Sequence, residues 1–344
     1  MMKRILALLL LASLAACTKE SVDAPTAINV YTWSNYFSPE AVARFEKESG
    51  VKVNFSYFSS NDELMAKLQA GARGYDVILP SGYVVKALKT LGLLQPLKGG
   101  AMAEAKHLTA RFRNPAYDPD LEYVMPFTWG TTGLAVNKAK VKQKVDSWAW
   151  VFSHPEMKGK ITMLDDPADV IGAALKLSGH SLNAGEPEAL KKAQALLREQ
   201  KKFLKAYTSE TKPLLESGEV AIAQAYSSDV GQAMQVNPNI EFVTPKEGGP
   251  LWTDNLAIPV GAPSPETAKK FIRFMTRPEI AALQSKFLFT NPVVNLPAGD
   301  SVMKQLQKAG MIPSPELMAK LESNSDDPAL HEAHARLWTE LKAE

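Results

Sequence analysis

The sequence predicts an α/β protein built from two lobes, and three observations support this. At 344 residues the chain is long enough for about two domains. Short β-prone runs alternate with amphipathic helical segments in two separate sets, within residues 28–94 and 161–275. With 45% hydrophobic and 22% charged residues, the composition is that of ordinary globular proteins.

The first set predicts strands and helices in strict alternation. Residues 28–31 are a short β-prone run, and Ser38-Pro39-Glu40 is typical of a helix start, with Gly50 closing that helix. The remaining elements of the set are strands over residues 51–57 and 75–79 and helices over residues 61–71 and 84–94. Strands joined by single helices pair in parallel with right-handed crossovers, so we expect an open α/β sheet.

The second set follows a lysine-rich stretch, residues 138–144, which we interpret as a solvated loop. The predicted strands cover residues 161–164, 220–225 and 256–259. The predicted helices cover residues 167–177, 187–205 and 264–275, and a further helix begins near Asp229. This second α/β set accounts for the second lobe.

The N-terminus predicts a bacterial export signal. Lys3-Arg4 precedes an apolar run over residues 5–14, too short for the roughly 20 residues that span a bilayer. The following Leu14-Ala15-Ala16-Cys17 resembles the lipobox of bacterial lipoproteins, in which the cysteine becomes the acylated first residue. The alternative is plain secretion, with Cys17 in the discarded peptide. Residues 1–17 are therefore expected to be a lipoprotein signal peptide and residues 18–27 a polar tether.

Cysteine count and charge exclude several classes of protein. A single cysteine excludes an intramolecular disulfide framework and thiolate-rich metal sites. The formal charge is +2, and two of the positive charges lie in the predicted signal peptide. A nearly neutral mature chain lacks the basic excess of nucleic-acid-binding proteins, so we expect no nucleic-acid partner.

The residues that follow the predicted strands differ between the two sets. In open α/β sheets ligands bind at the carboxyl ends of the strands. In the first set these positions are aromatic and hydroxylic: Trp33, Ser34, Tyr36, Ser59, Ser60, Asn61, Ser81 and Tyr83. In the second set they are largely acidic: Asp165, Asp166, Asp169, Tyr226, Ser227, Ser228 and Asp229, with Trp252 and Asp254 just before the strand at residue 256.

This combination indicates an alkyl chain that carries amines. Tryptophan and tyrosine faces attract cations and cover methylene groups, and carboxylates accept charge-assisted hydrogen bonds from ammonium groups. Taken singly, each aromatic residue could instead belong to the core, and each aspartate could be a helix N-cap. The pattern recurs at the strand ends of both sets, which favours a binding site.

At these residues the chain resembles the extracytoplasmic substrate-binding proteins of ABC-type spermidine/putrescine importers. The resemblance covers nearly the whole mature chain. Its motifs are residues 30–36 (VYTWSNY), 60–63 (SNDE), 75–81 (YDVILPS), 126–133 (PFTWGTTG), 245–249 (PKEGG), 252–259 (WTDNLAIP) and 336–342 (RLWTELK).

The resemblance implies the two-lobed periplasmic-binding-protein fold of type II, each lobe an open α/β sheet, with the ligand cleft between the lobes. It places residues 28–132 and 256–298 in lobe 1 and residues 133–255 and 299–344 in lobe 2. It further implies a monomer held outside the cytoplasm by a lipid anchor on Cys17, with a polyamine ligand, ABC permease subunits as partners and no cofactor.

The resemblance also implies which residues of this chain contact the ligand, because they stand at the positions of the family's site residues. Trp33, Tyr36, Tyr83 and Trp252 resemble the family's aromatic walls, and Ser34 and Ser81 its polar contacts. Asp166, Asp169 and Asp254 resemble its amine-binding carboxylates, and Asp229 an acid of the putrescine-type members. Phe289 falls where the family often has tyrosine, and Ser209 falls near a serine of the pocket.

Three departures concern the choice of amine. Tyr226 stands where family members carry tryptophan, Asn35 replaces an acid, and Asp169 is one methylene shorter than the usual glutamate. The amine class is therefore supported, whereas chain length is left open between putrescine and spermidine. A single methylene discriminates by only about 1–3 kcal/mol.

Other functions fit the sequence less well than polyamine binding. The sequence has no Gly-x-Ser-x-Gly elbow, P-loop or dinucleotide fingerprint, and no cysteine nucleophile after Cys17, so we expect no enzyme. The carboxylates would also suit Ca²⁺, although flanking tryptophans favour an organic cation.

His331 and His334 would share one face of a C-terminal helix, where a metal site is conceivable but a solvated or packed pair is expected. A polyamine sensor that reports to a membrane receptor is the remaining alternative.

Overall fold

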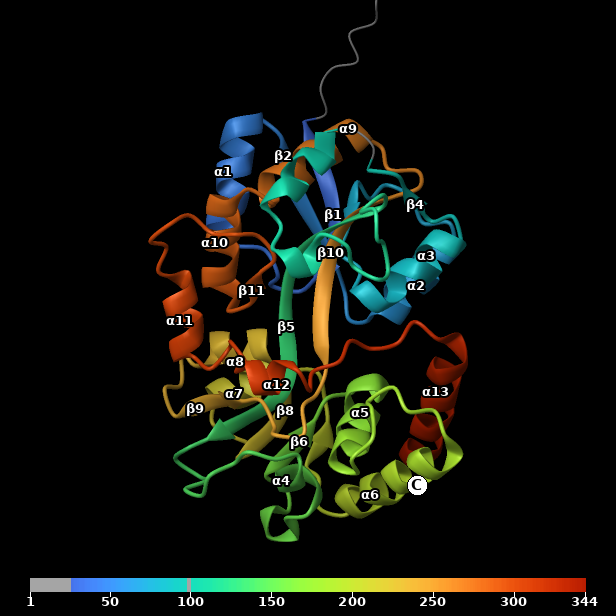
Figure 1. Cartoon of the computed structure of the whole chain (residues 1–344), viewed down its shortest axis with the longest axis vertical. Coiled ribbons are helices and arrows are strands. Elements are labelled where there is room, and N and C mark those ends of the chain that lie inside the picture. The colour runs from blue at the N-terminus through green and yellow to red at the C-terminus, as the bar shows by residue number, and fades with distance from the viewer. Residues whose placement is uncertain (1–25, 98–99) are drawn as a thin grey trace, which may run out of the picture.

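The structure is a computed structural model and describes residues 26–97 and 100–344. The predicted signal peptide, Cys17 and most of the tether lie outside the described residues. Within the described ranges, no helix is both long and apolar enough to cross a membrane. Two lobes lie one above the other in Figure 1, and the strands β5 (Val124–Asn137) and β10 (Leu251–Pro259) run between them.

Lobe 1 contains the predicted parallel sheet, in which β1 lies between β2 and β3 and is parallel to both. Ser38 caps the first helix through its side chain, and Gly50 ends it in a left-handed conformation with φ of 72°. The elements of lobe 1 are β1 (Ala27–Trp33), α1 (Pro39–Ser49), β2 (Lys52–Phe58), α2 (Asn61–Gln69), β3 (Val77–Ile78), α3 (Gly82–Thr90), β4 (Leu94–Gln95), η1 (Gly100–His107), η2 (Ala110–Phe112), α9 (Pro265–Met275), α10 (Pro278–Leu288) and β11 (Asn291–Pro292).

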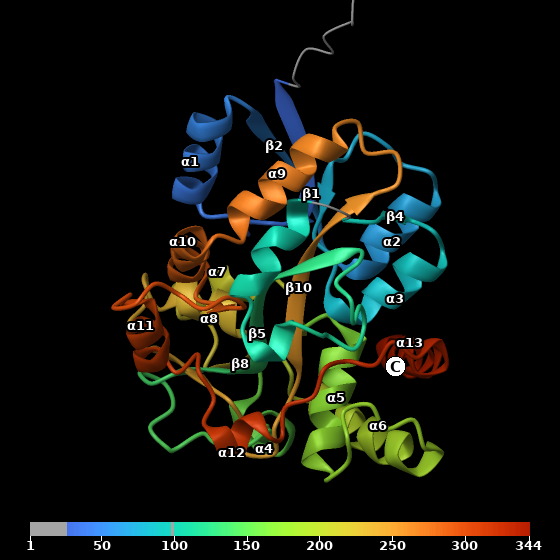
Figure 2. The ribbon, with the colours of Figure 1, turned by 45° about the horizontal axis from the view of Figure 1, so that its top comes forward.

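Lobe 2 contains a second sheet, in which β6 is parallel to β7 and β8, and β8 is antiparallel to β5. Figure 2 shows the C-terminal helix α13 beside α5 at the side of this lobe. Its elements are α4 (Ala149–Phe152), η3 (Pro155–Met157), β6 (Ile161–Met163), α5 (Pro167–Leu177), α6 (Pro187–Lys201), β7 (Ala206–Tyr207), α7 (Thr211–Glu216), β8 (Ile222–Tyr226), α8 (Ser227–Ala233), β9 (Ile240–Val243), α11 (Val302–Lys308), α12 (Pro315–Met318) and α13 (Pro328–Ala343).

The two sheets are continuous because β5 and β10 serve both lobes. The two strands pair antiparallel from Thr131 with Leu251 to Val124 with Ala257, with a register shift between Asp254 and Asn255. Every residue of β5 is buried. The boundaries predicted at residues 132/133 and 255/256 fall inside these strands, so the connection between the lobes is itself regular sheet.

Several predicted element ends were wrong. The helix predicted over residues 84–94 ends at Thr90, because Gly92 takes a left-handed conformation and Leu94 pairs with β10 instead. The strand predicted at residue 256 begins at Leu251, so Trp252 and Asp254 lie within a strand rather than before it. The helix predicted from Asp229 begins at Ser227, and the helix predicted to reach residue 205 ends at Lys201.

Apolar side chains bury both faces of each sheet. One cluster in lobe 1 gathers Phe45 of α1 and Phe271 of α9 on one face, and a second gathers Leu64 and Val85 of α2 and α3 on the other. In lobe 2, α5 and α6 cover one face of the sheet. A further cluster joins α8 to α10 and includes Phe289, so α10 also packs against lobe 2.

Candidate ligand-binding site

Asp254 is a buried carboxylate held by two hydroxyl donors from lobe 1. Asp254 lies within β10 beside the register shift and is only 5% exposed. Ser81, the residue before α3, donates from Oγ to Asp254 Oδ1 at 2.6 Å. Tyr36, in the loop after β1, donates from Oη to Asp254 Oδ2. Both donors come from positions that the strand-end argument selected.

Burial raises the pKa of Asp254 to about 6, while hydrogen bonds from Ser81 and Tyr36 oppose the shift. Burial, followed by the nearby Asp254 charge, raises the pKa of the Tyr36 hydroxyl well above its usual value. Two neutral donors therefore serve this acid, and no lysine or arginine of the described chain forms an ion pair with it. A cation near Asp254 would lower its pKa again.

Two more acids, Asp166 and Asp169, lie at the start of α5 in lobe 2. Asp166 caps the helix, accepting backbone N–H bonds from Ala168 at 2.9 Å and from Asp169 at 3.2 Å. Asp169 is 5% exposed, and its Oδ1 has no hydrogen-bond partner among the described residues. Burial is the main cause that raises the pKa of both acids, and the neighbouring Asp166 charge raises that of Asp169 further.

Thr132 of β5 and Tyr226 of β8 lie near Asp169, and their hydroxyls oppose the rise in its pKa. The Thr132 hydroxyl is itself buried without a hydrogen-bond partner in the described part of the chain. An ammonium group donates up to three hydrogen bonds. The free oxygen of Asp169 and the neighbouring hydroxyl therefore form an acceptor set that such a donor would complete.

Asp229 is the fourth acid and lies in the first turn of α8. Its Oδ2 accepts a hydrogen bond from the Thr211 hydroxyl at 3.2 Å. Burial raises the pKa of Asp229 to about 6, opposed by Thr211 and by the positive charge of Lys212. Lys212 donates to Gln232 and pairs with Glu216 at 3.8 Å. No ion pair between Lys212 and Asp229 is present in the described residues.

The aromatic residues stand around these acids. Trp252 lies against Gly130 of β5, so closely that a Cβ on Gly130 would come within 2.4 Å of the indole ring. Tyr226 meets Trp252 edge to face, with ring centroids 6.4 Å apart. Trp33 packs edge to face on Phe58 at 4.5 Å. These large, flat surfaces are suited to cover methylene groups.

Tyr83 connects the lobes. Its hydroxyl accepts a hydrogen bond from Asn61 of lobe 1 at 3.0 Å, and Asn61 also accepts from the Ser81 backbone N–H. Burial and then the charge of Asp166 in lobe 2 raise the pKa of Tyr83. Its ring also meets His331 of α13 edge to face at 5.7 Å. The acids of lobe 2 therefore lie close to the strand ends of lobe 1.

Known proteins resemble this chain over nearly its whole length. Residues 40–309 match the family model described as bacterial extracellular solute-binding protein. The chain belongs to this family. It is 33% identical over 370 residues to the putrescine-binding periplasmic protein SpuD of Pseudomonas aeruginosa, covering 99% of this chain and 98% of the relative.

Two further similarities agree with this assignment. The spermidine/putrescine-binding periplasmic protein of Escherichia coli is 31% identical over 318 residues, covering 91% of this chain and 90% of the relative. Among solved structures, the spermidine/putrescine substrate-binding protein PotD of Streptococcus pneumoniae superimposes with a TM-score of 0.79 at 27% identity, covering 92% of this chain and 99% of that chain.

Three residues selected from the sequence make no contact with the acids among the hydrogen bonds and packing contacts of the described residues. Ser34 and Ser209 are exposed, and neither side chain makes a hydrogen bond within the described part of the protein. Phe289 ends α10 with φ of 57° and packs against Gly231 of α8 as part of an apolar cluster. The structure therefore gives Phe289 a packing role behind α8.

Sequence reasoning missed residues that hold the site of this solute-binding protein together. Thr132 lies in a segment that the sequence marked only as a family motif at the predicted lobe boundary. Thr211 lies between the helix predicted to end at residue 205 and the strand predicted to begin at residue 220. Asn61 was selected both as a helix start and as a strand-end residue, but its hydrogen bonds to Tyr83 and Ser81 were not predicted. The sequence offered one indication of Thr132, its place in the glycine-flanked run GTTG of the motif over residues 126–133.

Proposed function

We propose that this chain captures a polyamine of the putrescine or spermidine type between its lobes and delivers it to an ABC-type permease. One observation carries the proposal. Burial raises the pKa of four acids, Asp166, Asp169, Asp229 and Asp254, of which Asp169 and Asp254 are only 5% exposed. Across residues 26–97 and 100–344 none of the four forms an ion pair with a lysine or arginine. A buried carboxylate without a cation is costly, so the ligand must supply the positive charge.

Several features favour an organic ammonium over a metal ion. Among the residues that the structure describes, no three histidine, cysteine or acidic side chains are close enough together to hold a metal ion. The acids are accompanied by indole and phenol faces, which suit methylene groups and cationic nitrogens. The relatives described above are named for putrescine and spermidine.

The ligand contacts that we propose belong to both lobes. Lobe 1 contributes the hydroxyl-bound Asp254, and lobe 2 contributes Asp166, Asp169 and Asp229. Before ligand binds, like charges on the two lobes repel one another as the cleft narrows. A diamine places an ammonium group on each side and converts this repulsion into attraction. Closure then requires the ligand, and the joined rims of the lobes become the surface that a permease can recognise.

The proposed set of ligand residues is Trp33, Tyr36, Ser81, Tyr83, Asp166, Asp169, Tyr226, Asp229, Trp252 and Asp254. Ser34 follows β1 with an exposed side chain, and we keep it in the proposed set as a polar contact. The protein binds and releases its ligand unchanged. We further propose that acylated Cys17 and the tether hold the protein at the outer face of a membrane, beside its permease.

Calorimetric titration tests the function. The chain from Thr18 onward would be unfolded and refolded to remove any carried ligand, then titrated with putrescine, cadaverine, spermidine, spermine and Ca²⁺. Binding of one amine at micromolar Kd or tighter, about −8 kcal/mol or better, is the expected result. Failure of a correctly refolded protein to bind any amine, or preferential binding of Ca²⁺, would overturn the proposal.

A further inference from the structure

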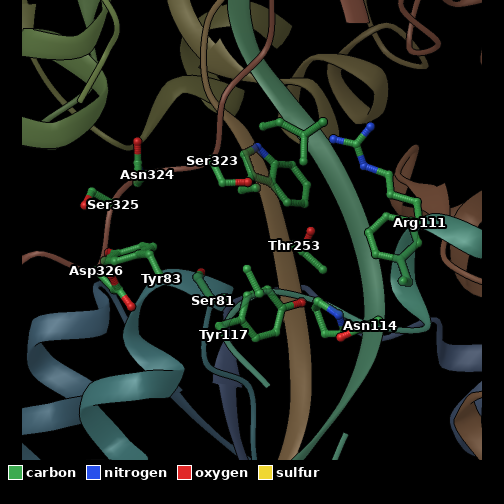
Figure 3. Close-up of a pocket in the computed structure, with 16 residues that line it drawn as sticks. Ser81, Tyr83, Arg111, Asn114, Tyr117, Thr253, Ser323, Asn324, Ser325 and Asp326 are labelled. Carbon is green, nitrogen blue, oxygen red and sulfur yellow. The ribbon is translucent and has the colours of Figure 1, made fainter. Parts of the chain in front are cut away.

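A chamber of about 440 Å³ opens beside the carboxylate site, and Ser81, Tyr83 and Trp252 are among the residues that line it. Figure 3 shows its three walls: the loop of lobe 1 that carries Asn114 and Tyr117, the strand β10 at Thr253, and the segment between α12 and α13. Ser81 and Trp252 border both the chamber and the carboxylate site. A ligand bound at Asp254 can therefore extend into the chamber without leaving the cleft.

The chamber differs chemically from the carboxylate site. Among the described residues that line the chamber, the one acid, Asp326, is already paired with Lys86 at 3.1 Å. Its one basic residue, Arg111, stands over Trp129 at 5.9 Å and forms no ion pair with a described acid. A second ammonium group entering the chamber would thus meet no free carboxylate. The chamber is suited to a polar group without positive charge.

Free hydrogen-bonding groups line this space. The side chains of Asn114 and Ser323 make no hydrogen bond to any part of the chain that the structure describes. The indole N–H of Trp252 is buried and likewise has no acceptor within those residues. An ammonium group carries three donors and no acceptor, so a fully protonated polyamine leaves this N–H unsatisfied. A carbonyl oxygen is an acceptor that would satisfy it.

We propose that the cleft also takes N-acylated polyamines, with the ammonium groups on the carboxylates and the acyl carbonyl in the chamber beside Trp252 and Asn114. This inference rests on the proposed function, because the carboxylates hold the ligand's charged end. It extends that function to amines in which one nitrogen has become an amide and has lost its charge.

A matched pair of ligands tests the inference by calorimetry. N1-acetylspermidine and N-hexylputrescine have the same chain length and carry two ammonium groups each, but only the first has a carbonyl oxygen. The hexyl chain is also the more apolar of the two, so hydrophobic burial favours the control. We expect N1-acetylspermidine to bind at least tenfold more tightly. Equal affinity, or tighter binding of N-hexylputrescine, would overturn the inference.

Two variants locate the carbonyl. Asn114→Ala removes an exposed chamber side chain that lies outside the proposed carboxylate site. It is expected to weaken N1-acetylspermidine about threefold or more and to leave the Kd of putrescine unchanged. Trp252→Phe keeps an aromatic face and removes the N–H, so it should reduce the preference for the acetylated ligand over N-hexylputrescine. If each variant weakens N1-acetylspermidine and N-hexylputrescine by the same factor, the placement of the carbonyl in the chamber is contradicted.

The outcomes separate this inference from the proposed function. If putrescine or spermidine binds and the acetylated ligand shows no preference over its alkyl control, water serves the Trp252 N–H and only the inference fails. If no amine binds the refolded protein, the proposed function fails as well. Preferential binding of the acetylated ligand supports both.

Discussion

Ser81 and Asp254 lie 173 positions apart in the chain, yet they are joined by a side-chain hydrogen bond of 2.6 Å and by an isolated antiparallel backbone bridge. Ser81 precedes α3 of lobe 1, and Asp254 lies in the strand that runs between the lobes. The double connection holds the Asp254 carboxylate on the lobe 1 side. The sequence boundary at residue 255 assigned this acid to lobe 2, whereas its hydrogen-bond partners come from lobe 1.

Asp254→Asn tests the central carboxylate. The amide keeps the shape of the side chain and an oxygen that accepts from Ser81, so the fold should be retained. Loss of the charge leaves a buried ammonium without its partner, and we expect a loss of about 2–5 kcal/mol in polyamine binding, measured by calorimetry. Asp120→Asn, at an exposed acid without an ion pair in the described chain, is the matched control. A loss below about 0.5 kcal/mol would remove Asp254 from the site.

Binding should weaken as the pH falls through about 6. Asp254 and Asp229 of the ligand-free protein have pKa values raised to about 6 by burial. Below that pH they bind protons and no longer attract an ammonium group, whereas the amine keeps its proton because its pKa resembles the lysine value of about 10. Calorimetry between pH 8 and pH 5 measures the effect. An affinity that stays flat over this range would count against recognition by these acids.

The stability of the ligand-free protein should change with pH in the opposite sense. A carboxyl whose pKa is higher in the folded protein than in the unfolded chain makes the folded state bind more protons, so stability increases as the pH falls through about 6 toward 4. For Asp254 the difference corresponds to roughly 3 kcal/mol. Thermal unfolding at pH 7.5 and pH 5 measures this dependence. In Asp254→Asn it should be shallower, and an identical slope in both proteins would contradict the assignment.

Gly130→Ala tests the seat of Trp252. The added Cβ would lie 2.4 Å from the indole Cζ2 and 2.6 Å from the Ser227 hydroxyl, so the ring must move. Overpacking of this kind costs about 1–3 kcal/mol, and displacement of the ring should weaken polyamine binding at least tenfold. Titration and tryptophan fluorescence report the two effects. In Gly185→Ala, the control, the Cβ meets Leu330 at an ordinary 3.4 Å. Unchanged binding by Gly130→Ala would show that the ring is not part of the site.

The ion pair between Lys86 and Asp326 spans the two lobes, from α3 to the segment before α13. Lys86→Glu should speed ligand dissociation a few-fold, because like charges then face each other in the closed form. Adding Asp326→Lys should restore the slower rate. Both side chains are partly solvated, so the coupling should stay below about 1 kcal/mol and should shrink at high salt. A double variant that dissociates as fast as Lys86→Glu would exclude this contact from closure.

The sequence predicted the parallel part of the fold well and the strands between the lobes poorly. The segments around β1 and β2 alternate or cap in recognisable ways, and their helices begin and end near the predicted residues. β5 is buried along its whole length, so it has no alternation of polar and apolar residues, and it contains Pro126, Gly130 and Gly133. β10 carries Asp254 and Asn255 in its interior, residues that are uncommon in strands.

The expectation that ligands bind at the carboxyl ends of strands identified site residues that follow a strand. It misplaced site residues that lie inside a strand. It found Tyr36 and Ser81, which follow strands and both donate to Asp254. It also found Asp169, which is buried at the start of α5. Trp252 and Asp254 were selected for their chemistry but placed outside the strand that contains them. The supporting hydroxyls of Thr132 and Thr211 depend on contacts between distant segments, which spacing along the sequence does not reveal.

The pairing of β3 with β10 also affects the order in which the protein can fold. Ile78 pairs with Ala257, so the sheet of lobe 1 lacks a strand until most of the chain has been synthesised. Contacts that join such distant segments form slowly, since long loops must close first. The nascent chain therefore stays incompletely folded for longer than a protein built from contiguous domains. Such a delay keeps the chain available for translocation before it folds, which suits the export that the N-terminal sequence predicts.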